Sequence, residues 1–124
     1  MIMDGLEYYV DAGVSTSYTS GGSIWTDLSG KGNDFSRIGS NGFSPTHGGG
    51  AIQFSANGYF NAPASSAFLA ASEITVEAWA YLKGYASTNT GIVSNYVGAQ
   101  GKMNWMFSSH GGSLRIHNNG FKGS

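Results

Sequence analysis

Apolar and polar residues alternate along much of this chain, and the longest alternating run covers residues 73–82. The even positions of this run are all aliphatic: Ile74, Val76, Ala78, Ala80 and Leu82. Its odd positions carry two acids, a threonine and two aromatic rings. Because successive side chains of a β-strand point to opposite faces, the run predicts a strand with one face in a core and an opposite face that is polar and aromatic.

Shorter runs of the same kind predict further strands at residues 6–12, 52–54, 59–60, 92–97, 103–107 and 114–117. They recur about every 8–12 residues between glycine-rich turns, which is typical of an all-β sandwich or barrel. No long stretch keeps the helical period, so we expect almost no helix, apart from one turn near residues 65–69. The pair Asn119-Gly120 predicts a hairpin turn, although little sequence follows it.

The length of 124 residues fits a single domain covering residues 1–124. Only 10% of the residues are charged, against roughly 25% in an ordinary soluble domain, and the net charge is −1. Non-specific nucleic-acid binding needs clustered Lys and Arg, so we expect no nucleic-acid partner. The chain has no cysteine, which excludes disulfides, thiol catalysis and cysteine-based zinc sites.

The expected location follows from what the sequence lacks and from its composition. No apolar run approaches the roughly 20 residues of a membrane span, so we expect no membrane insertion. The first residues show neither the basic nor the apolar region of a signal peptide. The uncharged, aromatic and small-polar composition is nevertheless typical of extracellular proteins. A protein that is assembled into a virion and released by lysis needs no signal peptide, so we expect a virion or extracellular location.

Four motifs follow one another along the chain. They are GLEYYVDAG at 5–13, WTDLSGKGND at 25–34, GGAIQF at 49–54 with GYF at 58–60, and ITVEAW at 74–79 with GIVS at 91–94. In this order they resemble the front part of laminin-G-like, concanavalin A-like jelly-roll modules. The resemblance implies an antiparallel jelly-roll β-sandwich. It also implies a function in adhesion or assembly, because such modules occur in secreted adhesins, glycosidase accessory domains and bacteriophage virion proteins.

The sequence departs from this family in its second half. The W-x-H-[VI]-A strand and the Y-x-N-G hairpin that usually follow are absent. A sandwich that lacks strands exposes unpaired edges and apolar faces. We therefore expect a sandwich that is incomplete as a monomer and is completed by association, and the alternative is that the chain is a fragment of a longer protein.

The candidate catalytic groups do not form a recognisable constellation. Glu73 and Glu77 share one face of the predicted strand, but four residues of strand separate them by about 13 Å. This is too far for the two carboxylates of either glycosidase geometry. The sequence has no G-x-S-x-G and no G-x-x-x-x-G-K-[ST], and His47, His110 and His117 lack the spacing of a metal site. We therefore predict a protein that is not an enzyme.

Oxygen-bearing side chains gather in the glycine-rich loop that follows Trp25: Asp27, Ser29, Asn33 and Asp34. Calcium takes six to eight oxygen ligands in flexible geometry, so this loop is a candidate calcium site, with Asp11 as a further ligand from a neighbouring strand. No other cofactor is expected. The alternative is that Asp27 and Asn33 accept backbone N–H groups in Asx-turns while Gly30 and Gly32 adopt positive φ.

The resemblance also implies sugar binding, which needs an aromatic platform together with polar groups for the hydroxyls. The candidates are Trp79, Tyr81 and Glu77 on one face of the predicted strand, with Asn95 or Asn104 on adjoining strands. The alternative is that Trp79 packs under a covering loop as a structural residue. Trp25 and Trp105 are predicted to belong to the core, because apolar neighbours share their phase.

The resulting hypothesis is a non-catalytic virion surface or structural protein of a bacteriophage, such as a capsid decoration or a tail or fibre component. Its partners would be other virion proteins or copies of itself, and a cell-surface glycan is a further candidate. The alternative hypothesis is a carbohydrate-binding lectin module of a secreted or cell-surface protein.

Overall fold

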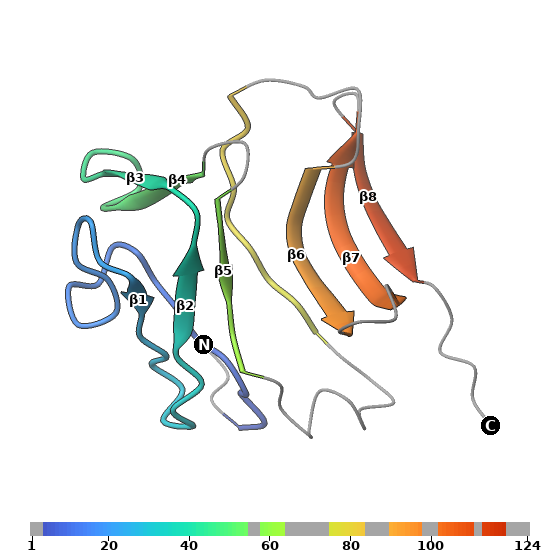
Figure 1. Cartoon of the computed structure of the whole chain (residues 1–124), viewed down its shortest axis with the longest axis horizontal. Coiled ribbons are helices and arrows are strands. Elements are labelled where there is room, and N and C mark those ends of the chain that lie inside the picture. The colour runs from blue at the N-terminus through green and yellow to red at the C-terminus, as the bar shows by residue number, and fades with distance from the viewer. Residues whose placement is uncertain are drawn as a thin grey trace. The chain divides into compact units, whose positions relative to one another are not determined.

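The computed structural model describes residues 4–54, 58–63, 75–83, 90–97, 102–110 and 113–118. The chain divides into two compact units, Met1–Ala71 and Ser72–Ser124, and each is described by itself. The described residues contain β-strands and no helix, and every pair of neighbouring strands is antiparallel (Figure 1). The all-β class predicted from the alternation is therefore confirmed.

The first unit contains a three-stranded sheet and a separate hairpin. The sheet has the order β1-β2-β5, and its strands are β1 (Ile24–Trp25), β2 (Phe35–Ile38) and β5 (Tyr59–Asn61). The hairpin pairs β3 (Asn41–Ser44) with β4 (Ala51–Phe54). In the register of the sheet, Trp25 lies opposite Phe35 and Arg37 lies opposite Phe60. The strands expected around residues 52–54 and 59–60 are therefore present.

Aromatic rings form the core of the first unit. Among the described residues of this unit, the most deeply buried apolar one is Tyr18, which is 3% exposed. The ring of Tyr18 lies 5.6 Å from Phe43 and 6.0 Å from Phe60. Trp25 contacts the Phe60 ring edge-on at 5.4 Å, which confirms the core position predicted for this tryptophan. Edge-to-face pairs of this kind contribute roughly 0.5–1.5 kcal/mol each beyond the area that they bury.

The second unit contains a three-stranded meander in the order β6-β7-β8. Its strands are β6 (Thr90–Val97), β7 (Lys102–His110) and β8 (Ser113–Asn118), as the alternation at 92–97, 103–107 and 114–117 predicts. The register shifts twice between β6 and β7: Ile92 is the extra residue in β6 and Asn104 the extra residue in β7. Such bulges bend a strand and increase its twist.

Two predicted strands are wrong, and the first of them is the segment 6–12. Residues 6–11 belong to no strand. Their backbone groups are bound by side chains and loops instead of by a neighbouring strand. The Tyr9 N–H donates to the Asp27 carboxylate, and the Tyr9 carbonyl accepts from the Leu28 N–H. The Asp11 N–H donates to the Ser17 hydroxyl. Alternation alone does not reveal this competition for the backbone.

The second wrong strand is the run 73–82, whose described part, 75–82, also belongs to no strand although it follows a drawn-out course (Figure 1). All of its side chains are exposed. Of the predicted alternation, only a difference in exposure between the aliphatic and the aromatic side chains is observed. Val76 and Leu82 are 36% and 37% exposed, whereas Trp79 and Tyr81 are 92% and 78% exposed. A strand needs a partner for its N–H and C=O groups, and a sequence pattern does not identify that partner.

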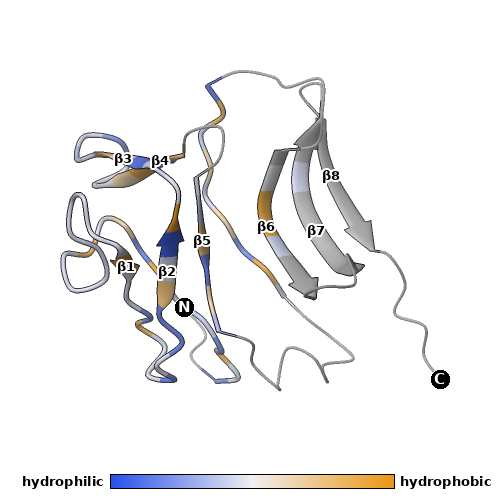
Figure 2. Cartoon of the chain, in the orientation of Figure 1, coloured by the Kyte–Doolittle hydropathy of each residue, from blue (hydrophilic) through white to orange (hydrophobic). Residues whose placement is uncertain are grey.

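Two short strands lack a clear sequence signal. β2 reads Phe-Ser-Arg-Ile, and its central Arg37 gives it the hydrophilic stretch seen in Figure 2. β3 reads Asn-Gly-Phe-Ser and contains a glycine, which weakens a strand pattern. The helical turn expected near 65–69, the Asn119-Gly120 turn and residues 73–74 lie outside the described residues.

The turn from β3 to β4 passes close to the backbone near Ala12 and yields a testable prediction. Gly50 has φ +149°, and a Cβ built on it would lie 2.6 Å from the Ala12 carbonyl oxygen. We expect Gly50→Ala to lower the free energy of unfolding by about 1–3 kcal/mol, measured by urea denaturation. The control is Gly21→Ala, because Gly21 has φ +78° with nothing within 4 Å of the built Cβ. Equal losses in the two variants would show that the close approach to Ala12 contributes nothing.

Candidate functional site

The carboxylate of Asp27 is the centre of the loop that the sequence marks as a candidate calcium site. Asp27 is only 7% exposed. One of its oxygens, Oδ1, accepts the Tyr9 and Ser29 N–H groups, each at 2.9 Å. The other, Oδ2, accepts the Ser29 hydroxyl at 2.7 Å and the Asn33 N–H at 3.0 Å. A carboxylate offers about four acceptor positions, and these four donors use all of them.

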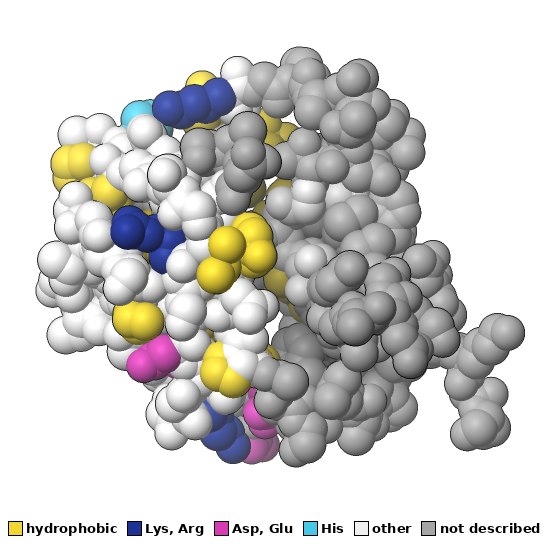
Figure 3. Space-filling model, in the orientation of Figure 1, with side chains coloured by type: hydrophobic (Ala, Val, Ile, Leu, Met, Phe, Trp, Pro, Cys, Tyr) yellow, Lys and Arg dark blue, Asp and Glu magenta, His cyan; other side chains and the backbone are white. Residues whose placement is uncertain are grey.

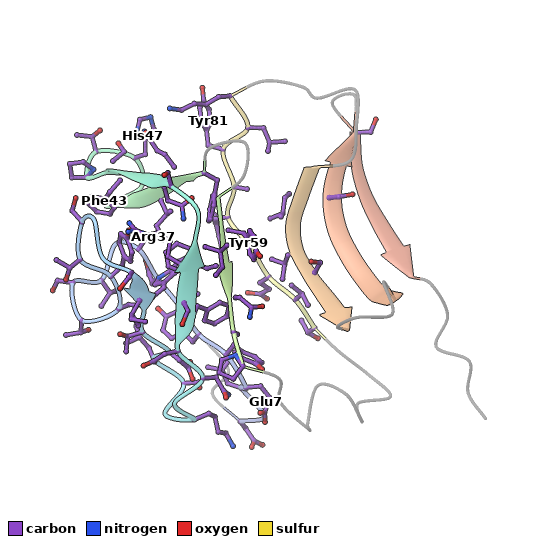
Figure 4. The ribbon with its side chains drawn as sticks, viewed as in Figure 1. Glu7, Arg37, Phe43, His47, Tyr59 and Tyr81 are labelled. Carbon is purple, nitrogen blue, oxygen red and sulfur yellow. The ribbon has the colours of Figure 1, made fainter. Side chains whose placement is uncertain are left out.

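Other contacts tie the same loop to the N-terminal segment. The Asn33 side-chain amide donates to the Glu7 carbonyl at 3.0 Å, and the Ser29 hydroxyl lies 3.2 Å from the same oxygen. The Asp27 N–H donates to Asp34 Oδ1 at 2.9 Å. At the exposed rim, the Lys31 ammonium lies 3.9 Å from the Glu7 carboxylate. Figure 4 shows Glu7 at one end of the first unit, whereas Phe43 and His47 lie at the other end by the β3–β4 hairpin.

The geometry is that of the Asx-turn alternative. The bond from the Ser29 N–H to Asp27 Oδ1 closes the turn, and Gly30 and Gly32 have φ of +83° and +71°. Asn33 differs from the expectation, because its side chain donates to a carbonyl instead of accepting a backbone N–H. Asp11 accepts the Gly13 N–H at its own turn. Within the described ranges, no three His, Asp or Glu side chains are grouped so as to hold a metal ion.

The hydrogen bonds also set the charge state of this carboxyl. Burial by itself would raise the pKa of Asp27, but the N–H groups of Tyr9, Ser29 and Asn33 and the Ser29 hydroxyl outweigh that effect. The pKa of Asp27 therefore lies below its ordinary value. The loop thus holds an ionised, nearly buried carboxylate whose partners are all neutral donors.

The candidate sugar platform lies in the second unit. Glu77, Trp79 and Tyr81 share one described segment and are all exposed, and Trp79 is 92% exposed. The indole is therefore not packed under a covering loop, which was the structural alternative. Asn95 and Trp105 lie opposite one another in β6 and β7. The segment offers a stacking surface for the apolar face of a sugar ring or for another protein.

A serine–histidine contact in the turn after β3 was not anticipated from the sequence. The Ser44 hydroxyl lies 2.7 Å from His47 Nδ1 and 3.3 Å from the Thr46 hydroxyl. Ser44 is buried, and the three residues lie within four positions of one turn. This local Ser-Pro-Thr-His arrangement closes the turn that brings β4 back along β3. The spacing of Ser44 and His47 is the only sequence signal that could have indicated the contact.

No known protein family, curated protein or solved structure matches this chain. The described residues include no helix with the length and apolar character needed to cross a membrane.

The low pKa of Asp27 predicts how the stability of the protein depends on pH. A carboxyl whose pKa is depressed in the folded state stabilises that state fully above its unfolded pKa of about 3.9, and the stabilisation is lost as the pH falls through the folded pKa. We expect the free energy of unfolding to decrease as the pH is lowered from about 5 to 3. Asp27→Asn should flatten this dependence, as measured by urea denaturation at each pH.

The same variant should be destabilised at neutral pH, because an amide NH₂ cannot accept the hydrogen bonds made at one of the two oxygens. Two lost bonds to a charged group correspond to about 3–6 kcal/mol. Asp34→Asn is the matched control, since an amide oxygen can still accept the Asp27 N–H. A pH profile of Asp27→Asn that is identical to that of the parent would contradict this account.

The full donor set predicts the response to calcium. A calcium ion would have to displace N–H and O–H donors from Asp27, so melting curves in millimolar calcium and in EDTA should superimpose. A ligand that binds the folded state raises the melting temperature. An increase in calcium that Asp27→Asn abolishes would establish the calcium site instead.

Proposed function

We propose that this chain is a non-catalytic assembly or adhesion module on the surface of a bacteriophage virion, of the capsid-decoration or tail-fibre kind. The observation that carries the proposal is the exposed segment 75–82. It presents a tryptophan and a tyrosine that are 92% and 78% exposed, together with partly exposed Val76 and Leu82. Exposed apolar surface of this kind is typical of sites that bind another molecule.

The energetics favour contact with a partner over permanent exposure. Burying apolar surface contributes about 25 cal/mol per Å², and a large aromatic side chain can bury roughly 150–250 Å². Two exposed aromatic residues on one short segment can therefore supply several kcal/mol to an interface, where Trp and Tyr are common energetic anchors. The charged side chains that Figure 3 colours are scattered, and only 10% of the residues in the whole chain are charged, with a net charge of −1, so electrostatic repulsion between copies is weak.

The fold that we propose for the module is a concanavalin A-like jelly-roll sandwich. The antiparallel sheets and the absence of helix from the described residues are compatible with it. The motif order that resembles laminin-G-like modules supports it further. Such a sandwich supplies a rigid support for a binding segment, and it needs no catalytic group.

A carbohydrate-binding lectin module is the second candidate function, and a specific observation favours it. Glu77, Trp79 and Tyr81 are all exposed on one short segment. This combines aromatic faces with a carboxylate that can accept hydrogen bonds from hydroxyl groups. Asn95 would contribute only if β6 adjoins this segment. The two functions differ in what the isolated protein binds, because a lectin module binds glycans and an assembly module binds copies of itself or another virion protein.

The prediction is that the purified chain sediments as an oligomer at micromolar concentration. Trp79→Ser should shift the population toward monomer by removing an indole that is 92% exposed, measured by sedimentation velocity. Thr75→Ser, in the same exposed segment, is the control and should leave the distribution unchanged. A monomer that binds glycans on an array, with binding lost in Trp79→Ser, would replace the assembly function with the lectin function.

A further inference from the structure

The segment 77–83 is nearly symmetric about Ala80. It reads Glu-Ala-Trp-Ala-Tyr-Leu-Lys, and all seven side chains are exposed. Glu77 and Lys83 lie three residues before and after Ala80, and Trp79 and Tyr81 adjoin it on either side. Ala78 and Leu82 lie between the charged and the aromatic residues. None of the seven residues belongs to a strand of the described structure.

This symmetry matters because antiparallel strands place residues opposite one another in a fixed order. If two copies of the segment pair about a two-fold axis at Ala80, Glu77 of each copy lies opposite Lys83 of the other. In the same register Trp79 lies opposite Tyr81, and Ala78 lies opposite Leu82. Residues that lie directly opposite in an antiparallel pair share a face of the sheet. One face then carries aromatic pairs flanked by ion pairs, and the other face is aliphatic.

Neighbouring registers lose these pairings. A shift of one residue places Trp79 opposite Leu82 or Ala80 and mixes the aromatic and aliphatic faces. A shift of two residues keeps the two faces separate. In one direction it places the Trp79 residues of the two copies opposite each other and Glu77 opposite Tyr81. In the other direction it places the two Tyr81 residues opposite each other and Trp79 opposite Lys83. Only the register centred on Ala80 matches both charges and both aromatic residues.

We propose that two copies of this chain associate by antiparallel pairing of residues 77–83 about Ala80. The inference rests on the assembly function proposed above and names the partner as a second copy. The opposite charges at the ends of the segment and the aromatic pair between them specify the register, and main-chain hydrogen bonds between the two copies would hold it.

A cysteine placed at the proposed two-fold axis tests the register directly, because the chain has no cysteine of its own. Directly opposite Cα atoms in an antiparallel pair lie about 4.5–5.5 Å apart, within the range that a disulfide spans. Ala80→Cys should therefore form a disulfide-linked dimer under mild oxidation. Thr75→Cys is the control: its two copies would lie roughly 33 Å apart in this register, because about ten residues of strand separate them. It should not cross-link.

A charge exchange provides a second test that needs no cross-link. Glu77→Lys and Lys83→Glu should each raise the dimer dissociation constant by roughly 2- to 30-fold, since each removes two cross-strand ion pairs. The variant that carries both substitutions should restore the parent value, because the charges at the two facing positions are then exchanged and again opposite in sign. Sedimentation equilibrium gives the dissociation constants.

The outcomes separate this inference from the function on which it rests. Selective cross-linking of Ala80→Cys with rescue in the double variant establishes the pairing. An oligomer in which neither cysteine cross-links, or both do so equally, overturns the pairing and leaves the assembly function standing. A parent protein that is monomeric, together with an Ala80→Cys variant that forms no cross-link, overturns both, and sugar binding by that monomer would assign the segment to a glycan.

Discussion

The buried carboxylate of Asp27 joins the segment around Tyr9, which lies eighteen residues earlier in the chain, to the loop up to Asn33 that follows the strand ending at Trp25. Because Asp27 follows β1 after one residue, fixing its position also fixes the end of that strand. The Thr26 N–H then donates to the Ser17 carbonyl, and Ser17 adjoins the buried ring of Tyr18. The hydrogen bonds around Asp27 and the aromatic core around Tyr18 therefore depend on one another.

The way in which backbone groups are hydrogen-bonded explains which strands the alternation of apolar and polar residues predicted correctly. The alternation identified β4 to β8 because their backbones pair with other strands, so side-chain alternation and backbone pairing agree. It failed for residues 6–11, where Asp27 and Ser17 bind the backbone groups that a neighbouring strand would otherwise use. Asp, Asn and Ser compete for backbone hydrogen bonds over a distance along the chain that a local pattern does not reveal. β2 and β3 lack the alternating signal, because the charged Arg37 interrupts the pattern of β2 and a glycine interrupts that of β3.

The sequence predicted which residues gather in the candidate site, but it did not predict whether they bind a cation or the protein's own backbone. The sequence placed Asp27, Ser29 and Asn33 in one glycine-rich loop, and the structure brings them together. Whether such a loop holds a cation or binds its own backbone depends on which donors reach the carboxylate, and one of them, the Tyr9 N–H, lies eighteen residues away. For Trp79 the sequence could not decide between a structural and an exposed aromatic, because that depends on what covers the segment. In the structure Trp79 is exposed.

The two charges that bracket the segment 77–83 also restrict how it can associate. A parallel, in-register arrangement would place Glu77 beside Glu77 and Lys83 beside Lys83, and like charges directly opposite are destabilising. That arrangement is also the one in which identical segments stack without limit. Antiparallel pairing about Ala80 turns the same charges into attractive contacts and uses one edge of each segment. In a chain with only 10% charged residues, one acid and one base at these positions therefore favour a closed pair over an open stack.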